Sequence, residues 1–426
     1  MMQIVLKKFI KKCLNEYFLN DINTLRMSNP SLGQLVIALK TNSKLFRSKL
    51  ATNFLLSLYN YAIELESNLP YFETTNKKIY IMHVCVWGES YSEKLLSYLI
   101  PSLLSKHNIP AISHNYNIKF CIVCDKTTNN KCKSSDIMKL FNQYVDIIYN
   151  VIPDDIFINL KKSETSLVEK TICFILKRTP TWKYQLLGCL QNVATKLAKN
   201  NSAYISYLMP DMLLSDSAIT NMFNAIDNEK TAVAVTAFRS SFFKVKKEVK
   251  KYRTDLVLCI PSLALPEIAV ETMHISAQNR IISTKNKSIN ITPQFIYSYS
   301  TQVVIRAFHY HPMLINFAKV TCEINFDYLP IDNTLFYELI DQNHPLEDQI
   351  FVNEDASYIG VMELSDDDIE ATKIVARNLD IKLAVSKYFN INNWNKINLF
   401  LFSKRCIYNT NRENENMISD IPEIVI

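Results

Sequence analysis

The sequence predicts an α/β protein with a mostly parallel, open sheet flanked by helices. Apolar, β-rich runs of strand length alternate along the chain with helical stripes of leucine and isoleucine, and this alternation favours a parallel sheet. The hydrophobic content of 48%, with 22 Tyr and 22 Phe, is enough to form a sizeable core. A chain of 426 residues is long for one ordinary domain. We therefore expect a central domain with additions at its ends.

The first part of the chain, residues 1–76, is expected to be helical. Four lysines alternate with apolar residues in residues 1–20, which is typical of an amphipathic helix rather than a signal peptide. Such a helix either packs on the sheet or makes a peripheral membrane contact. No apolar run approaches the ~18 residues that span a bilayer. The ten scattered cysteines indicate free thiols in a reducing, cytoplasmic compartment.

The central domain, residues 77–365, is expected to begin with a buried strand. Residues 78–87 form one continuous β-rich run, as expected of a strand covered on both faces. Gly88 ends this run, and Ser90 with Glu93 has the S-x-x-E pattern of a capping box that opens a helix. Pro101 is expected to kink or divide that helix.

The following elements are expected to alternate in the same way. Strands are predicted over residues 118–124, 145–151, 203–208, 232–237, 294–299 and 303–311. Helices are predicted over residues 182–198, from Ser215 onwards and over residues 261–277. The last part of the chain, residues 366–426, is expected to be an extension that ends in a polar, disordered tail.

The scarcity of glycine excludes several nucleotide-binding chemistries. Only four glycines occur, and no two of them lie within fifty residues of each other. Dinucleotide-binding folds, SAM-dependent methyltransferases and P-loop enzymes need clustered glycines for close backbone contact with the ligand. A nucleotide at this sheet would instead be recognised by side chains and a metal. The mild net charge of +6 does not signal nucleic-acid binding.

Several polar residues fall at the carboxyl ends of the predicted strands, where ligands bind in such sheets. These residues are Trp87, Gly88, Asp125, Asp211 and Arg239. Asp211 is a candidate ligand for Mg²⁺ or Mn²⁺ bridging a diphosphate, because hard cations prefer oxygen ligands. A turn aspartate is the alternative. Arg239 is expected to follow a strand directly and to pair with a diphosphate, whereas the lysines after it read as a solvated helix face.

Two histidines form a second candidate group. His309 and His311 are two residues apart, so in a strand both imidazoles point to the same side. They are candidates for binding a metal or a phosphate, or for proton transfer, and a half-buried structural pair is the alternative. Cys121 and Cys124 form a CxxC within a predicted strand, where they face opposite sides, so we expect no zinc site there.

Acidic residues near the C-terminal side form a third group. A glycosyl transfer with inversion requires a carboxylate that deprotonates the acceptor hydroxyl. Asp327, which lies between Phe326 and Tyr328, is the favoured base, and Asp355 is a further catalytic candidate. The remaining acids of this group are Glu323 and Glu363. Surface acids without a catalytic role are the common alternative.

Three stretches in order carry a resemblance to a known family. The first is VWGESYSEKLLSYLIPSLLSKHNIPAI at residues 86–112, and the second is YLMPDMLLSDSAI at residues 207–219. The third is FHYHPMLINFAKVTCEINFDYLP at residues 308–330, followed by EDASYIGVMELS at residues 354–365. Together they resemble glycosyltransferase-like proteins of the GT-A, or nucleotide-diphospho-sugar transferase, type that are often found among bacterial surface-polysaccharide genes.

This resemblance implies a GT-A-like sheet and a function. A sugar would move from a nucleoside-diphosphate donor to a hydroxyl of a glycan or lipid-linked acceptor. Family members bind the donor diphosphate through Mn²⁺ or Mg²⁺ held by an Asp-x-Asp after a short strand. Asp211 stands at that position, and residues 87–89, ending in Glu89, stand where the donor base is held. The histidine pair would line the pyrophosphate or acceptor side.

The sequence also departs from the family pattern. Met209 occupies the first position of the Asp-x-Asp, and Asn325 replaces an acid that would precede Asp327. Both departures put metal binding in question. Two alternatives to the glycosyltransferase therefore stay open, a catalytically degenerate protein that binds a nucleotide or glycan, and a peripheral membrane adaptor that uses the N-terminal helix.

Overall fold

The computed structural model describes most of the chain between residues 49 and 409. The described residues are 49–73, 76–165, 182–227, 229–278, 280–282, 288–289, 294–299, 302–308, 310–320, 331, 335–341, 343–366, 379–380 and 396–409. The chain divides into two compact units. Unit 1 comprises residues 1–69, 152–193 and 326–330, and unit 2 comprises residues 70–151, 194–325 and 331–426. The predicted limits at residues 76 and 365 stay a prediction.

Unit 1 is helical in its described part. It contains α3 (Lys49–Ser67), α9 (Asp154–Thr165) and the beginning of α11 (Trp182–Asn200). Helices α3 and α9 pack together, and the side-chain amide of Asn159 donates to Ser57 Oγ at 3.4 Å. None of the helices in the described ranges is long and apolar enough to cross a membrane. The predicted amphipathic segment, residues 1–20, lies outside the described residues.

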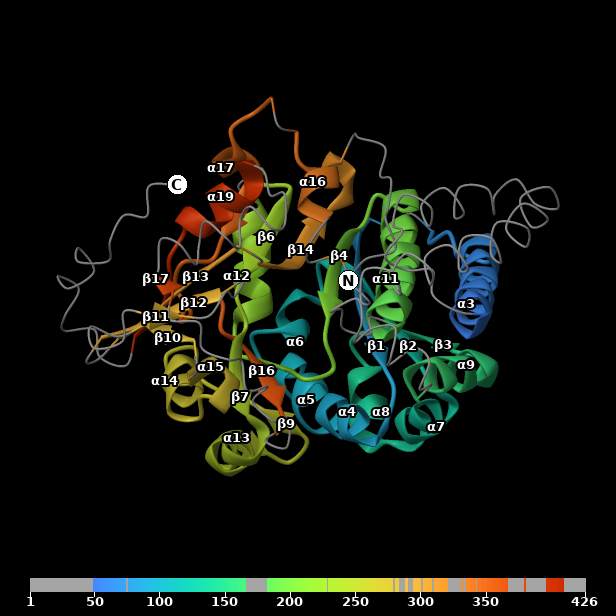
Figure 1. Ribbon diagram of the computed structural model, residues 1–426, viewed down its shortest axis with the longest axis horizontal. Helices are drawn as coiled ribbons and strands as arrows, with labels where there is room; N and C mark the ends of the chain where they lie inside the picture. The colour runs from blue at the N-terminus through green and yellow to red at the C-terminus, as the bar shows by residue number, and fades with distance from the viewer. Residues whose placement is uncertain are drawn as a thin grey trace, which may run out of the picture. The chain divides into compact units, whose positions relative to one another are not determined.

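The main sheet of unit 2 has seven strands in the order β15-β6-β14-β4-β1-β2-β3 (Figure 1). All neighbouring strands are parallel except β14, which runs antiparallel to β4 and β6. The strands are β1 (Lys78–Val86), β2 (Tyr116–Cys124), β3 (Asp146–Val151), β4 (Tyr204–Leu208), β6 (Ala232–Val235), β14 (His311–Asn316) and β15 (Ile350–Val352). This mostly parallel sheet confirms the predicted α/β class.

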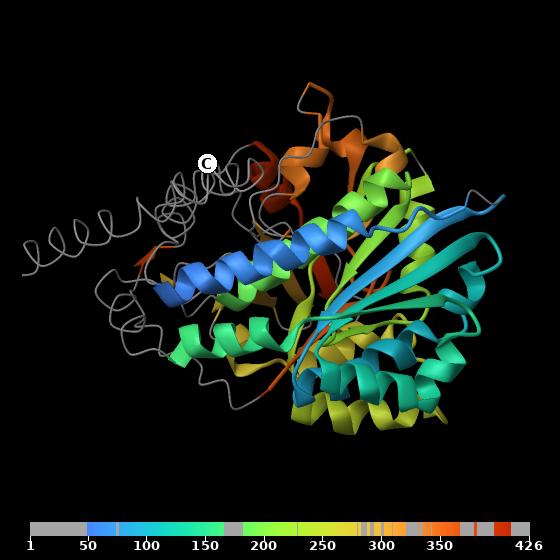
Figure 2. The ribbon, with the colours of Figure 1, turned by 90° about the vertical axis from the view of Figure 1, so that its right-hand side faces the viewer.

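The central strand β1 is covered on both faces, as its continuous apolar run predicts. Every residue of β1 after Lys78 is buried, and β2 and β4 pair with it in parallel on either side. Figure 2 shows the helices that connect β1 to β3 lying along one face of the sheet. Helix α4 (Glu89–Lys94) follows β1. The helical elements that contribute to the hydrophobic core are a π-helical turn (Leu95–Leu99), α5 (Ile100–Leu103), α6 (Ile109–Ile112), α7 (Lys126–Ser134), α8 (Asp136–Phe141) and α12 (Ala218–Asp227).

Unit 2 also contains a smaller sheet of three strands. It consists of β5 (Met212–Leu214), β16 (Val361–Ser365) and β7 (Phe238–Ser241), with β16 in the middle. Figure 1 shows α13 and α14 beside this sheet. The elements that follow β7 are α13 (Phe242–Glu248), a 3-10 turn η2 (Val249–Tyr252), β8 (Arg253–Thr254), β9 (Val257–Leu258), α14 (Ala264–Glu271) and α15 (Ile275–Gln278). Leu213, Val245 and Leu364 share its core.

The remaining described elements form two further small sheets and short helices. The sheets are β10-β12-β13-β18 and β11-β17. Their strands are β10 (Ile281–Ile282), β11 (Ser288–Ile289), β12 (Gln294–Tyr299), β13 (Gln302–Ala307), β17 (Leu379–Asp380) and β18 (Cys406–Asn409). The helices are η3 (Phe317–Lys319), α16 (Leu335–Leu339), α17 (Leu346–Gln349) and α19 (Lys396–Ser403). The tail predicted to be disordered lies outside the described residues.

The helix after β1 differs from its prediction at its start. Gly88 is the N-cap, and no side chain caps the helix. Ser90 Oγ instead donates to Asp366 at 3.0 Å, and Glu93 forms an ion pair with Lys246, so the predicted capping box is wrong. The predicted division near Pro101 is confirmed, because a π-helical turn ends directly before α5. Proline cannot donate the backbone hydrogen bond of a regular helix.

Two candidate residues lie elsewhere in the sheet than predicted. Strand β6 ends at Val235, and Arg239 lies inside β7 rather than after a strand. Strand β13 ends at Ala307, whereas His311 begins β14. His311 therefore does not continue the strand in which the pair was predicted, and residue 309 lies outside the described residues. The apolar run across both strands concealed the break between them.

Candidate functional site

Asp211 lies in the tight turn that joins β4 of the main sheet to β5 of the small sheet. The backbone N–H of Met212 donates to the carbonyl of Met209 at 3.0 Å, and Leu364 N–H donates to the carbonyl of Asp211 at 2.8 Å. These bonds hold the turn against β16. The side chain is buried, and among the described residues its Oδ1 has no hydrogen-bond partner. A buried carboxylate oxygen without a partner is unfavourable.

The surroundings of Asp211 shift its protonation. Burial, followed by the negative charge of Glu363, raises the pKa of Asp211 from 3.8 to about 7, although Lys94 and Arg239 act in the opposite direction. Both the neutral and the charged form are therefore populated near neutral pH. A ligand that brings or removes charge at this position would decide which form is present.

Glu363 and Arg239 are neighbours in the small sheet. Glu363 is aligned with Met212 of β5 on one side and with Arg239 of β7 on the other. Arg239 Nη2 lies 2.6 Å from Glu363 Oε1, and both side chains are partly exposed. The strand register thus places a carboxylate and a guanidinium beside the residue after Asp211. A partly exposed guanidinium remains able to add a phosphate oxygen to its hydrogen bonds.

Lys94 is a buried cation that sequence analysis missed. Its side chain is 2% exposed, and Nζ lies 2.9 Å from Asp366 Oδ1. The ammonium also lies 5.2 Å from the ring centroid of Tyr91 and 5.0 Å from that of Phe242. No local signal marked it, because a residue next to Leu95 in a helix does not share the same face, and its partner Asp366 is far away in the chain. A lysine among inward-facing positions is rare without a partner.

The loop between β1 and α4 lies, like Asp211, at the carboxyl end of a strand of the main sheet. Gly88 has a φ of 83°, which L side chains rarely adopt, and a Cβ at this position would meet nothing within 4 Å. Its N–H donates to Asp125 Oδ2 at 2.8 Å, while Asp125 Oδ1 accepts from Thr128 N–H at 2.7 Å. Asp125 therefore joins the ends of β1 and β2 and caps α7. The space beside Gly88 is open to a ligand.

The other predicted residues have separate surroundings. Trp87 is half-buried at the end of β1, and the exposed Glu89 lies 3.0 Å from Lys131 in an ion pair. His311 lies at the same sheet edge as the end of β4, because β14 runs antiparallel, and its Nε2 is hydrogen-bonded to the carbonyl of Tyr207. Asp355 follows β15, and its Oδ1 accepts from the N–H and the hydroxyl of Ser357 at 2.7 and 2.6 Å.

The structure thus brings Asp211 and Arg239 together with Glu363 and Lys94. It commits the oxygens of Asp125 and one oxygen of Asp355 to local turns. His309 and Asp327 lie outside the described residues. The catalytic, donor-binding and metal-binding roles of the predicted residues all stay predictions.

The described residues do not form a donor set for a metal ion. Within these ranges, no group of three or more His, Cys, Asp or Glu side chains could hold one. Two carboxylates, Asp211 and Glu363, share their surroundings with two cations, Lys94 and Arg239. Divalent cations prefer sites dominated by oxygen ligands, whereas this mixture is suited to anionic ligands that carry their own oxygens. Cys121 and Cys124 are buried in β2, where burial raises the pKa of each thiol to about 12.

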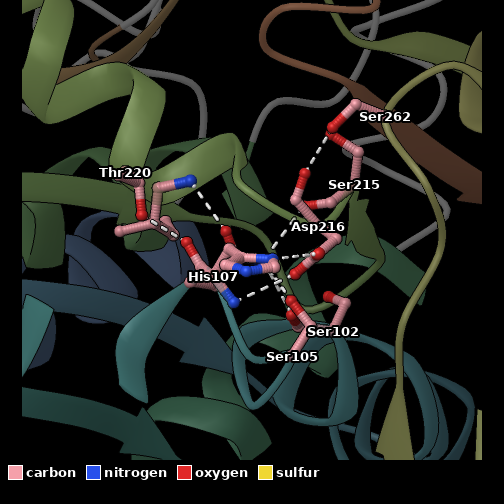
Figure 3. A network of polar contacts seen from close by, with 9 residues as sticks. Ser102, Ser105, His107, Ser215, Asp216, Thr220 and Ser262 are labelled. Atoms are coloured by element: carbon pink, nitrogen blue, oxygen red, sulfur yellow. Dashed lines mark hydrogen bonds and ion pairs between the residues drawn. The ribbon is translucent and has the colours of Figure 1, made fainter. Parts of the chain in front are cut away.

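A second polar network lies at the other end of β5 (Figure 3). Asp216 Oδ2 lies 2.6 Å from His107 Nδ1, and its Oδ1 accepts from His107 N–H at 3.1 Å. Asp216 N–H donates to the carbonyl of Ile260 at 2.8 Å. Burial raises the pKa of Asp216, but hydrogen bonds from His107 and Ser105 outweigh it, so the net pKa is lowered. Sequence analysis missed this network, because its members are far apart in the chain.

Comparisons with known proteins find similarity to solved structures. No family model matches the chain, and no curated protein matches it. Among solved structures, the crystal structure of mouse xyloside xylosyltransferase 1 in its apo form overlaps with a TM-score of 0.25 and 12% sequence identity. The overlap covers 41% of this chain and 60% of the xylosyltransferase chain, which is less than two thirds of its length. We base the functional proposal on the site itself.

Proposed function

We propose that the protein is a glycosyltransferase that binds a nucleoside-diphosphate sugar around Asp211, at the carboxyl ends of the strands. The observation that carries the proposal is the buried Asp211 carboxyl, which has an oxygen without a partner in the described ranges and two cations in its surroundings. A diphosphate fits the two cations, because it brings acceptor oxygens and negative charge together, and the hydroxyl of the sugar acceptor is the donor that the Asp211 oxygen lacks. The ordered stretches that resemble GT-A transferases support the same assignment.

The proposed roles follow from charge. Transfer breaks the bond between the sugar C1 and the diphosphate oxygen, and it forms a bond from C1 to the acceptor oxygen. Arg239 and Lys94 are positioned to stabilise the negative charge that develops on the leaving diphosphate. The acceptor hydroxyl loses its proton, and Asp211, with a pKa of about 7, is suited to take it. Asp327 is the predicted alternative base. The acceptor is proposed to be a glycan or a lipid-linked sugar.

Thermal stabilisation by donors tests the binding step. We expect one donor among UDP- and GDP-sugars to raise the melting temperature, and we expect the effect to persist in EDTA. Arg239→Gln should weaken the response about tenfold or more in donor concentration, because it removes a charged hydrogen bond. Lys77→Gln, a change at an exposed lysine, is the matched control. Lack of stabilisation by every donor and free nucleotide would contradict the proposal.

Two further measurements separate the alternatives. Release of free nucleotide on addition of acceptor distinguishes a transferase from a degenerate binding protein, which would bind donor without turnover. A donor response that requires Mn²⁺ would assign Asp211 to a metal and would contradict direct binding by the cations. In that case the complete donor set would include residues beyond the described ones.

A further inference from the structure

Helix α13 and the 3-10 turn η2 carry an unusually basic outer surface. Residues 242–254 contain six basic side chains and one acidic side chain, Glu248. Five lysines of this stretch are exposed, and together with Phe243 we name them the basic face. These lysines are Lys244, Lys246, Lys247, Lys250 and Lys251.

The orientation of the basic face is fixed by the core beneath it. Val245 and Val249 are buried, and Phe242 packs against the same core. Phe243 consequently points outward and is 60% exposed, and the ammonium of Lys247 lies 4.0 Å from its ring centroid. A single exposed aromatic side chain is ordinary. An exposed phenylalanine surrounded by lysines is a more specific combination of charge and apolar surface.

Two more apolar side chains are exposed on the segments that follow. Leu256 lies at the tip of the β8–β9 hairpin and is 39% exposed, and Leu263 lies just before α14 and is 58% exposed. The hairpin begins directly after η2, and the backbone N–H of Cys259 donates to the carbonyl of Tyr252 at 3.0 Å. The apolar hairpin tip is thereby held close in the fold to the end of the basic face.

The basic face adjoins the candidate site. The ring of Phe242 contacts the ammonium of Lys94, and Lys246 Nζ lies 3.3 Å from Glu93 Oε1. Ser241, the last residue of the strand that carries Arg239, accepts from Lys244 N–H at 3.3 Å and caps α13. Helix α13 therefore contacts the helix that carries Lys94 through Phe242 and Lys246, and Lys246 lies at the margin of the basic face.

We propose that the basic face docks on an anionic membrane surface, with Phe243 entering the headgroup region. Lysines attract anionic lipids, and an apolar side chain among them adds burial at the interface. The exposed aliphatic side chains Leu256 and Leu263 favour a membrane over a single-stranded nucleic acid, because bases stack on aromatic rings and not on leucine. The consequence for substrate, which rests on the proposed function, is that the acceptor is lipid-linked and reaches the site from the membrane.

Vesicle binding by the full chain tests the docking surface. The probes are phosphatidylcholine vesicles without and with 40% phosphatidylserine. We expect binding to the anionic vesicles only, weakening with salt. The triple variant Lys244→Gln, Lys247→Gln, Lys251→Gln should bind roughly 100-fold more weakly, since each lysine near such a surface contributes about a fivefold factor. The control triple is Lys106→Gln, Lys133→Gln, Lys139→Gln, which removes the same charge from exposed positions elsewhere.

Phe243→Ser separates membrane insertion from charge alone. It should weaken vesicle binding roughly fivefold to tenfold and leave binding to a single-stranded oligonucleotide unchanged. Tyr71→Ser, at an aromatic residue that is 73% exposed, is the matched control. Equal losses in both triple variants, or tighter binding to the oligonucleotide than to vesicles, would overturn the proposal. Donor-induced stabilisation without vesicles should be unaffected by the triple variant, so failure of docking and failure of the proposed function give different results.

Discussion

Asp211 and Asp216 stand at the two ends of the same short strand, β5, and their surroundings are opposite. Asp216 accepts hydrogen bonds from a histidine ring and a backbone N–H, and its net pKa is lowered. Asp211 is more deeply buried, retains an oxygen without a partner among the described residues and has its pKa raised to about 7. One carboxylate is satisfied by the fold, and the other is not.

This difference distinguishes a structural aspartate from a candidate binding residue. Donors supplied by neighbouring loops stabilise the charged form of Asp216, so its ionisation favours the folded state. At Asp211, burial and the charge of Glu363 outweigh its backbone hydrogen bond and the two nearby cations, so its ionisation opposes folding and its charge is available to a ligand. Perturbed pKa values concentrate at functional sites for this reason. The predictions below test whether the two residues behave as differently as their surroundings indicate.

The largest expected effect comes from removing the satisfied carboxylate. Asp216→Ala leaves the donors of His107 without their acceptor and should lower the free energy of unfolding by about 2–3 kcal/mol. Urea unfolding at pH 7 measures this loss. Asp136→Ala, at an exposed ion pair with Lys139, should cost less than about 1 kcal/mol. If the two variants lose equal stability, the network around Asp216 does not hold the loops together.

The second prediction concerns the unsatisfied carboxyl. Asp211→Asn should increase the free energy of unfolding at pH 8 by on the order of 1–3 kcal/mol, because it removes a buried charge. The same variant should keep the response to the donor, because it removes negative charge beside the diphosphate, but it should lose the transfer reaction, because an amide cannot take the proton of the acceptor. Stability and transfer should therefore change in opposite directions, and Asp216→Ala should lower stability without changing the donor response. A loss of stability in Asp211→Asn at pH 8 would show that its charge is compensated.

The third prediction concerns how the stability gained by Asp211→Asn depends on pH. The pKa of Asp211 in the folded protein is about 7, above its ordinary value of 3.8. Between these two values the folded state holds a proton that the unfolded state releases, so this group's contribution to stability falls as the pH rises toward 7. The advantage of Asp211→Asn should thus be large at pH 8 and nearly absent at pH 4. Chemical unfolding of both proteins across this range measures the difference.

The fold class was predictable from the sequence because its signals are local. The uninterrupted apolar run of β1 and the position of Asp211 after a short strand both lie within a few neighbouring residues. Lys94 illustrates what local patterns miss, since its partner Asp366 is far away in the chain. The same applies to His107 and Asp216, which only the folding of two loops brings together. The prediction placed Arg239 after the end of a strand, because the sequence pattern does not separate the two short strands β6 and β7.

The smallest expected effect concerns the partner of Asp216. The side chain of His107 is 54% exposed, whereas that of Asp216 is 15% exposed, so replacing the histidine buries no charge without a partner. His107→Gln retains a side-chain N–H that can reach the carboxylate, and the backbone N–H of residue 107 still donates to Oδ1. The expected loss is about 0.5–1 kcal/mol in the free energy of unfolding, well below that of Asp216→Ala. A double variant tests the coupling, because His107→Gln should have almost no effect once Asp216 is alanine. If the two losses add instead, the imidazole and the carboxylate act independently, and the proximity of these two groups is incidental to the stability of β5.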